Sequence, residues 1–212
     1  IGVIYGAFGA LKQTDLKYIN AYSSVRHLGM VLFALLMLNK TSWNGAILQS
    51  LSHGFMTALF FALIGMIYGR THTRDITKLG GLLKVMPFIS VIYVIAGMAS
   101  LGLPGFSGFV AEMNIFVGAF QHEGMFYRVA TIISVSAIVV TAVYILRVLG
   151  IMLMGEVKNE EFLDLPKATW FEITGILLLL IPMLGMGVAP LWLSDMTMES
   201  LEPFIQGVLN HL

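Results

Sequence analysis

Long hydrophobic blocks, separated by short polar connectors, make up most of this chain. A helix needs about 20 apolar residues to cross a bilayer, and the opening apolar run, residues 1–11, supplies about half of that. The hydrophobic segments that follow it are Tyr18–Leu38, Gly45–Tyr68, Leu83–Phe120, Phe126–Met154 and Trp170–Leu193. All but the segment 83–120 fit one crossing each. The pattern predicts an all-α, polytopic transmembrane helix bundle of about six spans.

The segment from residue 84 to 120 is too long for one ordinary span. As a straight helix rising about 1.5 Å per residue it would measure roughly 55 Å, against a hydrocarbon core of about 30 Å. Its middle contains Pro104, which has no backbone donor, and Gly102, Gly105 and Gly108, which leave room for a bend. We expect the helix to break between Gly102 and Gly108.

The break allows two topologies: one crossing built from two half-helices, or a hairpin of two short crossings. The hairpin would give a second half of about 14 residues, which is short for a span. It would also move Lys158 and Lys167 to the opposite side. We therefore favour the discontinuous single crossing. Broken helices are tolerated at membrane depth only where protein or a water-filled cavity satisfies the backbone, and they are typical of transport sites.

Basic residues fall unevenly on alternate connectors. One side would carry Lys12, Lys17, Arg70, Arg74, Lys78, Lys84, Lys158 and Lys167, and the other only Lys40 and Arg128. The positive-inside rule places the first set in the cytoplasm. Residues 1–193 are then the transmembrane bundle. Residues 194–212, which hold acidic but no Lys or Arg residues, form a C-terminal amphipathic tail that we expect to be an interfacial helix.

Composition excludes several other functions. The chain is 58% hydrophobic and 11% charged, so most of it belongs in lipid. Twelve Lys and Arg balance twelve Asp and Glu, which leaves no basic surface for nucleic acid. There is no cysteine, hence no Cys-ligated zinc or iron–sulfur cluster, and neither a His-x-x-x-His spacing nor a nucleotide-binding glycine loop occurs. We expect no cofactor and no metal in this chain, and its apolar start without Met predicts a fragment of a longer protein.

Glu112 is the clearest candidate for chemistry. It lies a turn or so beyond the predicted break, among apolar residues. A charged side chain at bilayer depth costs about 2.5–3.5 kcal/mol even on the lenient insertion scale. Such a carboxyl can gain and lose protons during operation. The alternative is a structural carboxyl that is permanently protonated or paired.

Two histidines accompany it. His53 shares a helix face with Gln49, Ser50 and Thr57, a polar stripe that we expect to point into the bundle. Imidazole is suited to relaying protons along such a stripe, although a neutral, hydrogen-bonded structural histidine is the alternative. His27 has serines one turn earlier and is a second candidate, with the same alternative.

Lys17 lies in the connector between the first two spans, next to Asp15. From physical chemistry alone, Asp15 is a helix cap and Lys17 an anchor that obeys the positive-inside rule. Lys17 is kept with Glu112, His53 and His27 as a candidate for proton translocation because it belongs to a longer motif.

That motif is one of several that resemble the antiporter-like subunits of respiratory complex I, the NADH:quinone oxidoreductase. The matching stretches are ALKQTDLK at 10–17, AYSSVRHLG at 21–29, SHG at 52–54, RTHTRD at 70–75 and ASLGLPGFSGFVAE at 99–112. The resemblance covers essentially the whole chain and implies the C-terminal part of such a subunit. A glutamate at 112, where related subunits place a lysine, resembles the M type, or chain 4. Arg26 departs from the pattern, which has a small or polar residue there.

The resemblance implies a subunit that moves protons across the membrane while quinone is reduced elsewhere in the complex. Its partners would be other membrane subunits, above all neighbouring antiporter-like ones, together with lipid, and separate partner subunits would carry FMN and iron–sulfur clusters. The chain would be part of an enzyme without holding a redox centre, in a bacterial inner membrane rather than a mitochondrial-type or thylakoid one. The alternatives are a subunit of a multisubunit Na⁺/H⁺ antiporter or of a membrane-bound hydrogenase, and a purely structural membrane module.

Overall fold

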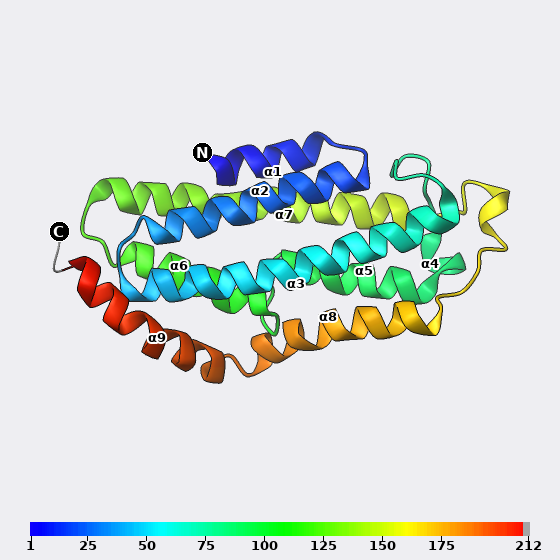
Figure 1. Cartoon of the computed structure of the whole chain (residues 1–212). Helices are drawn as coiled ribbons and strands as arrows, with labels where there is room; N and C mark the ends of the chain where they lie inside the picture. The colour runs from blue at the N-terminus through cyan, green and yellow to red at the C-terminus, as the bar shows by residue number, and fades with distance from the viewer. Residues whose placement is uncertain (210–212) are drawn as a thin grey trace.

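The structure of the chain, a computed structural model, describes residues 1–209, and every regular element in that range is a helix (Figure 1). The helices are α1 (Gly2–Lys12), α2 (Leu16–Leu35), α3 (Lys40–Thr71), α4 (Leu82–Val85), α5 (Pro87–Ser100), α6 (Ser107–Phe120), α7 (Met125–Leu153), the 3₁₀ turn η1 (Glu160–Phe162), α8 (Trp170–Val188) and α9 (Leu191–Leu209). Of these, α3, α7 and α8 are long and apolar enough to cross a bilayer, and α5 and α6 are shorter apolar helices. The predicted all-α, membrane-spanning fold class is confirmed.

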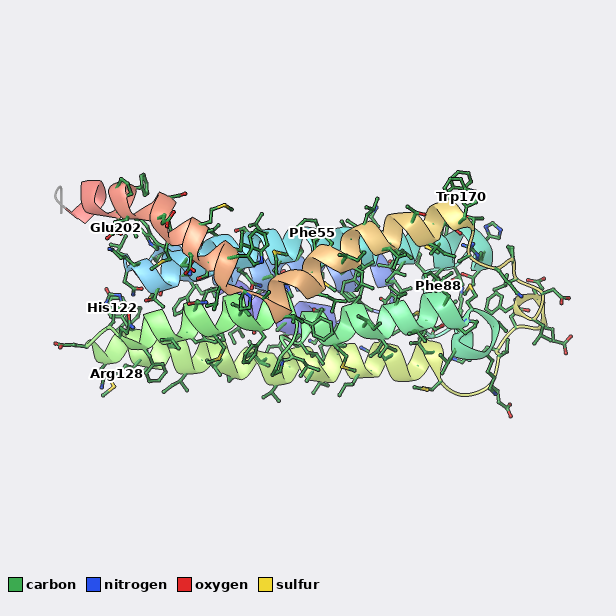
Figure 2. The ribbon with its side chains drawn as sticks, turned by 90° about the horizontal axis from the view of Figure 1, so that it is seen from below. Phe55, Phe88, His122, Arg128, Trp170 and Glu202 are labelled. Carbon is green, nitrogen blue, oxygen red and sulfur yellow. The ribbon has the colours of Figure 1, made fainter. Side chains whose placement is uncertain are left out.

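The long helices lie roughly along one axis, which gives the bundle two distinct ends (Figure 1). The α1–α2 turn, the C-terminal end of α3, α4 and the connector before α8 meet at one end; the α2–α3 and α6–α7 turns meet at the other. Figure 2 shows Arg128 at the end opposite Trp170. The connectors that hold the eight predicted cytoplasmic Lys and Arg residues therefore share one end of the molecule.

Polar contacts hold that basic end together. Arg70, at the end of α3, donates from its two terminal nitrogens to the two oxygens of Glu172, at 2.9 and 2.7 Å. Glu172 also completes a capping box with Thr169, which begins α8. In the connector between α3 and α4, hydrogen bonds from the hydroxyl and N–H of Thr77 hold the pKa of Asp75 below its usual value. The α3–α4 connector and the connector before α8 are thus fixed by side-chain hydrogen bonds.

The predicted helix break lies between α5 and α6, and the two half-helices follow one another along the same axis (Figures 1 and 2). Gly102 and Gly105 have φ values of +67° and +96°, in the left-handed region that favours glycine. The N–H groups of Gly102 and Leu103 close the end of α5 by donating to Ala99 and Met98, at 3.0 and 3.4 Å. The discontinuous single crossing is therefore confirmed and the hairpin is wrong.

The break differs from the prediction at its far boundary. Helix α6 begins at Ser107, so Gly108 lies inside a helix and not in the irregular segment. Gly108 still matters for packing, because a Cβ there would lie 3.0 Å from the carbonyl oxygen of Ala99. The glycine lets the first turn of α6 approach the last turn of α5.

Close backbone approach joins α3 to α6 and α8 to the break. A Cβ at Gly45 on α3 would lie 2.7 Å from the backbone nitrogen of Ile115 on α6. A Cβ at Gly187 on α8 would lie 2.5 Å from Cα of Phe106. Small residues let membrane helices pack through backbone contact. They hold α6, and any side chain on its inner face, against α3.

The C-terminal region forms a helix that begins earlier than expected. Helix α8 ends at Val188 rather than at Leu193, and α9 starts at Leu191 after Pro190. Figure 1 shows α9 at an angle to α8. Its contacts with the first turns of α3 include a hydrogen bond of 2.8 Å from Asn44 to Ser194. The interfacial position of this helix stays a prediction, and residues 210–212 of the expected tail lie outside the described residues.

Candidate functional site

Glu112 lies on α6, one turn beyond its start, and faces the interior of the bundle with 5% of its surface exposed. The break shapes its surroundings: a Cβ on Gly102 would lie 3.0 Å from Oε2 of Glu112, so a larger residue there would make the carboxyl shift. Its other oxygen, Oε1, is 3.2 Å from Nη2 of Arg26. Glu112 is thus a paired carboxyl in this structure.

Arg26, on α2, is completely buried. Its Nη2 donates to Glu112, its Nη1 lies 2.8 Å from Nε2 of His27, and its Nε has no partner among residues 1–209. A guanidinium has five N–H donors, no acceptor, and a charge that is not lost in proteins. In the sequence, Arg26 stands out only as a departure from a motif. A buried arginine in a span requires a counter-ion, and Glu112 is the acid that the fold supplies.

The contact with Arg26 decides the tautomer of His27. Because the guanidinium can only donate, Nε2 of His27 must accept. Its proton then resides on Nδ1, which donates to the backbone carbonyl of Ser23 at 2.8 Å. Both ring nitrogens are occupied, and the ring is 2% exposed.

His53, on α3, lies against His27 with the ring centroids 5.3 Å apart and the planes nearly parallel. Its Nε2 is 2.7 Å from Oγ of Ser24, and Oγ1 of Thr57 is 3.2 Å from its Nδ1. The predicted stripe is present in part. Thr57 contacts His53, whereas the hydroxyl of Ser50 donates instead to the carbonyl of Ala46 at 2.8 Å.

Further polar contacts tie this group to the rest of the bundle. The hydroxyl of Tyr144, on α7, donates to Oγ of Ser23 at 2.8 Å. Ser52 on α3 and Ser107 at the start of α6 share a hydrogen bond of 2.7 Å. Tyr144 and Ser107 could not be selected from the sequence, because a single polar residue among apolar ones gives no local sign of which way it faces.

Lys17 does not join this group. It is exposed at the start of α2, at the basic end of the bundle, and its N–H donates to Oδ1 of Asp15 at 2.8 Å. Asp15 therefore caps α2, as expected. His27 lies ten residues further along the same helix, which corresponds to about 15 Å. A role for Lys17 in proton translocation stays a prediction.

What we call the buried polar array consists of Arg26, Glu112, His27 and His53. It joins α2, α3 and α6 beside the helix break, deep in an apolar bundle. Among the described residues no group of three His, Asp or Glu side chains has the arrangement of metal ligands. Glu112 and the two histidines carry carboxyl and imidazole groups, which can bind and release protons, whereas the charge of Arg26 is permanent.

A polytopic helical bundle with a discontinuous helix and ionisable side chains beside the break is typical of a membrane transport protein. Comparison with known protein families identifies one family. The chain belongs to the NADH:quinone oxidoreductase/Mrp antiporter transmembrane family, whose model matches residues 1–141.

Named relatives support this membership. The chain is 38% identical over 195 residues to NAD(P)H-quinone oxidoreductase chain 4 3 of Trichormus variabilis, covering 90% of this chain and 36% of the relative. It is 35% identical over 190 residues to NADH-quinone oxidoreductase subunit M of Rickettsia conorii, covering 90% and 38%. The chain thus spans little more than a third of the length of these relatives.

Solved structures agree on the fold. A chain of respiratory complex I from Thermus thermophilus superposes with a TM-score of 0.86 at 25% identity, covering 97% of this chain and 42% of that one. The Mrp complex from Dietzia contains a chain with a TM-score of 0.82 at 21% identity, covering 98% and 47%. At that identity the second likeness shows the fold alone.

Proposed function

We propose that this chain is part of a proton-translocating membrane subunit, of the M or chain 4 type, in an NADH:quinone oxidoreductase. The observation that carries the proposal is the buried polar array beside the helix break. In it Arg26 contacts both Glu112 and His27, and the ring of His27 stacks on that of His53. The names of the relatives that are 35–38% identical support the assignment to a quinone oxidoreductase.

In this function the chain moves protons, and other subunits of the complex perform the redox chemistry. Glu112 takes up a proton at the break, and His53 passes protons along the hydroxyls of Ser24 and Thr57. Separate subunits carry FMN and iron–sulfur clusters, and neighbouring antiporter-like subunits and lipid surround this one. The complex lies in the inner membrane of a bacterial cell, with the basic end of the bundle in the cytoplasm.

Na⁺/H⁺ antiport is the second candidate, because the family description includes Mrp antiporters and one of them shares the fold. Glu112 favours the first candidate. By the resemblance of the motif around residues 99–112, antiporter subunits place a lysine where this chain has Glu112.

The test is proton translocation per NADH oxidised, measured in vesicles that contain the assembled complex. Glu112→Asp keeps the acid and should reduce the ratio mildly. The double variant Arg26→Gln/Glu112→Gln removes the acid without leaving an unpaired charge, and should abolish the contribution of this subunit. Glu202→Gln changes an exposed glutamate on α9 and is the matched control.

An unchanged ratio in the double variant, with normal assembly on native gels, would contradict the proposal. Proton movement that requires added Na⁺ and proceeds without NADH would support antiport instead. Impaired translocation in the double variant, with the Glu202→Gln complex normal, supports the proposal.

A further inference from the structure

Arg26 brings a permanent positive charge into the middle of the candidate proton path. Its side chain is completely buried, and Glu112 is the carboxylate to which it donates, at 3.2 Å. In this apolar setting the two charges neutralise each other only when Glu112 is ionised. The pair therefore stabilises the carboxylate, not the carboxylic acid.

These contacts set the formal charge of the group formed by Arg26, Glu112 and His27. Arg26 contributes +1, ionised Glu112 contributes −1 and neutral His27 contributes nothing, so the resting net charge is zero. One added proton on Glu112 brings the group to +1. A glutamate without the arginine would instead alternate between −1 and zero. Arg26 shifts the whole charge cycle by one unit.

The same arginine removes His27 from the titrating groups. A proton can bind His27 only at Nε2, and Nη1 of Arg26 already donates to that nitrogen at 2.8 Å. Protonation would also place two positive charges in direct contact.

His53 is different, because its partners are hydroxyl groups. The hydroxyls of Ser24 and Thr57 can each donate or accept, so they accommodate either neutral tautomer and the cation. Among residues 1–209, Tyr144 from α7 also faces the array, and its hydroxyl donates to Ser23.

We propose that Arg26 is a positioning residue that holds Glu112 as a carboxylate and His27 as a neutral, Nδ1-protonated imidazole, so that Glu112 and His53 carry the exchangeable protons. The proposal rests on the proposed function. A hydronium ion transfers a proton to Oε1 of Glu112: an O–H bond of the hydronium breaks and leaves water, an O–H bond forms at Oε1, and the hydrogen bond from Nη2 of Arg26 is displaced. When the proton leaves for water or a neighbouring acceptor, the ion pair re-forms.

Infrared difference spectroscopy of the reconstituted complex tests this without relying on proton pumping. The observable is the C=O stretching band of a protonated carboxylic acid, which a carboxylate lacks. The double variant Arg26→Gln/Glu112→Gln is the blank, since it has no carboxyl at 112 and no unpaired charge. Three samples are compared with it at neutral pH: the unchanged complex, Arg26→Lys and Arg26→Gln.

We expect no acid band from Glu112 in the unchanged complex, a full band in Arg26→Gln, and a reduced or absent band in Arg26→Lys, which keeps the charge. An acid band of full size in the unchanged complex would overturn the proposal. That comparison needs only the unchanged protein and the blank, so it decides the matter even if Arg26→Gln fails to assemble.

Nitrogen NMR of histidine-labelled complex provides the second readout. The expected spectrum of His27, assigned by its loss in His27→Gln, is that of a neutral ring protonated at Nδ1. A cationic or Nε2-protonated ring would overturn the proposal. Normal proton translocation in the double variant would refute the proposed function. The infrared band of Glu112 and the nitrogen spectrum of His27 instead test the effect of Arg26 on these two side chains, whatever the rate of translocation.

Discussion

Neutralising one member of the Arg26–Glu112 pair should destabilise the protein far more than neutralising both. The two side chains are 0% and 6% exposed. At 3.2 Å and an effective dielectric constant of about 20, their attraction is about 5 kcal/mol. Removing one partner of a buried pair typically costs about 3–5 kcal/mol, because it leaves an uncompensated charge in the interior. We expect that loss for Glu112→Gln, which leaves the permanent charge of Arg26 unpaired, and a smaller loss for Arg26→Gln, in which Glu112 can become neutral by binding a proton.

The double variant Arg26→Gln/Glu112→Gln should recover most of this loss, since no charge remains buried. The four proteins form a double-mutant cycle, in which we expect a coupling of several kcal/mol. The assay is the yield of assembled complex on native gels together with its thermal midpoint. A change of about 1.4 kcal/mol corresponds to tenfold in the folded-to-unfolded ratio, so Glu112→Gln should lower that ratio by two or more orders of magnitude.

The exposed pair between Lys40 and Glu202 is the matched control. Its side chains are 43% and 54% exposed. Exposed pairs contribute about 0–1 kcal/mol, so the same cycle with Lys40→Gln and Glu202→Gln should give almost no coupling. If the Arg26 and Glu112 substitutions were additive, as those of the control pair are expected to be, the buried ion pair would not stabilise the fold as we infer. The cycle also shows why Glu112→Gln alone is a poor test of proton transfer.

Other consequences can be measured separately. His53→Ala should slow proton translocation by about 10²-fold, the lower end of what a positioned proton donor or acceptor contributes, in a complex that assembles normally; an unchanged rate would leave His53 a structural residue. Gly187→Ala forces a Cβ into the backbone of the break and should destabilise the complex by about 1–3 kcal/mol. Gly185→Ala, with open space around it, should be neutral or stabilising by up to about 1 kcal/mol. Equal thermal midpoints for these two variants would refute this prediction. An impermeant thiol reagent should label Lys78→Cys only from the cytoplasmic side and Glu199→Cys only from the opposite side, and labelling of both from one side would contradict the proposed topology.

The sequence predicted the elements of this fold well because their causes are local. Hydrophobic length predicted α3, α7 and α8, the described helices that are long and apolar enough to cross a bilayer. The Pro104 region predicted the break, since a missing donor and permissive glycines act on the backbone wherever the chain goes. Asp15 as a helix cap is also a local effect. Boundaries were less accurate: Gly108 falls inside α6, and α8 ends at Val188, before Pro190, although apolar residues continue beyond it.

The candidate site was predicted as residues but not as an arrangement. Glu112, His27 and His53 could be selected from the sequence alone because polar groups at bilayer depth are costly and therefore informative. Lys17 was selected with them, yet the fold leaves it exposed at the end of the bundle. Arg26 looked like a local departure, because nothing near it in the chain reveals a partner.

The amino-acid sequence by itself determined that the chain is a helical membrane bundle, that one helix is broken, and that basic connectors alternate along the chain. Each of these depends on composition and spacing within one segment. Only the tertiary structure decided that Arg26 pairs with Glu112, 86 positions away, and that this contact leaves His27 an acceptor at Nε2. The physical reason is that hydropathy fixes how deep a side chain lies, whereas its partner depends on which helix faces meet. Glycines such as Gly45 let α3 and α6 approach closely, and this close packing fixes which faces of the two helices meet.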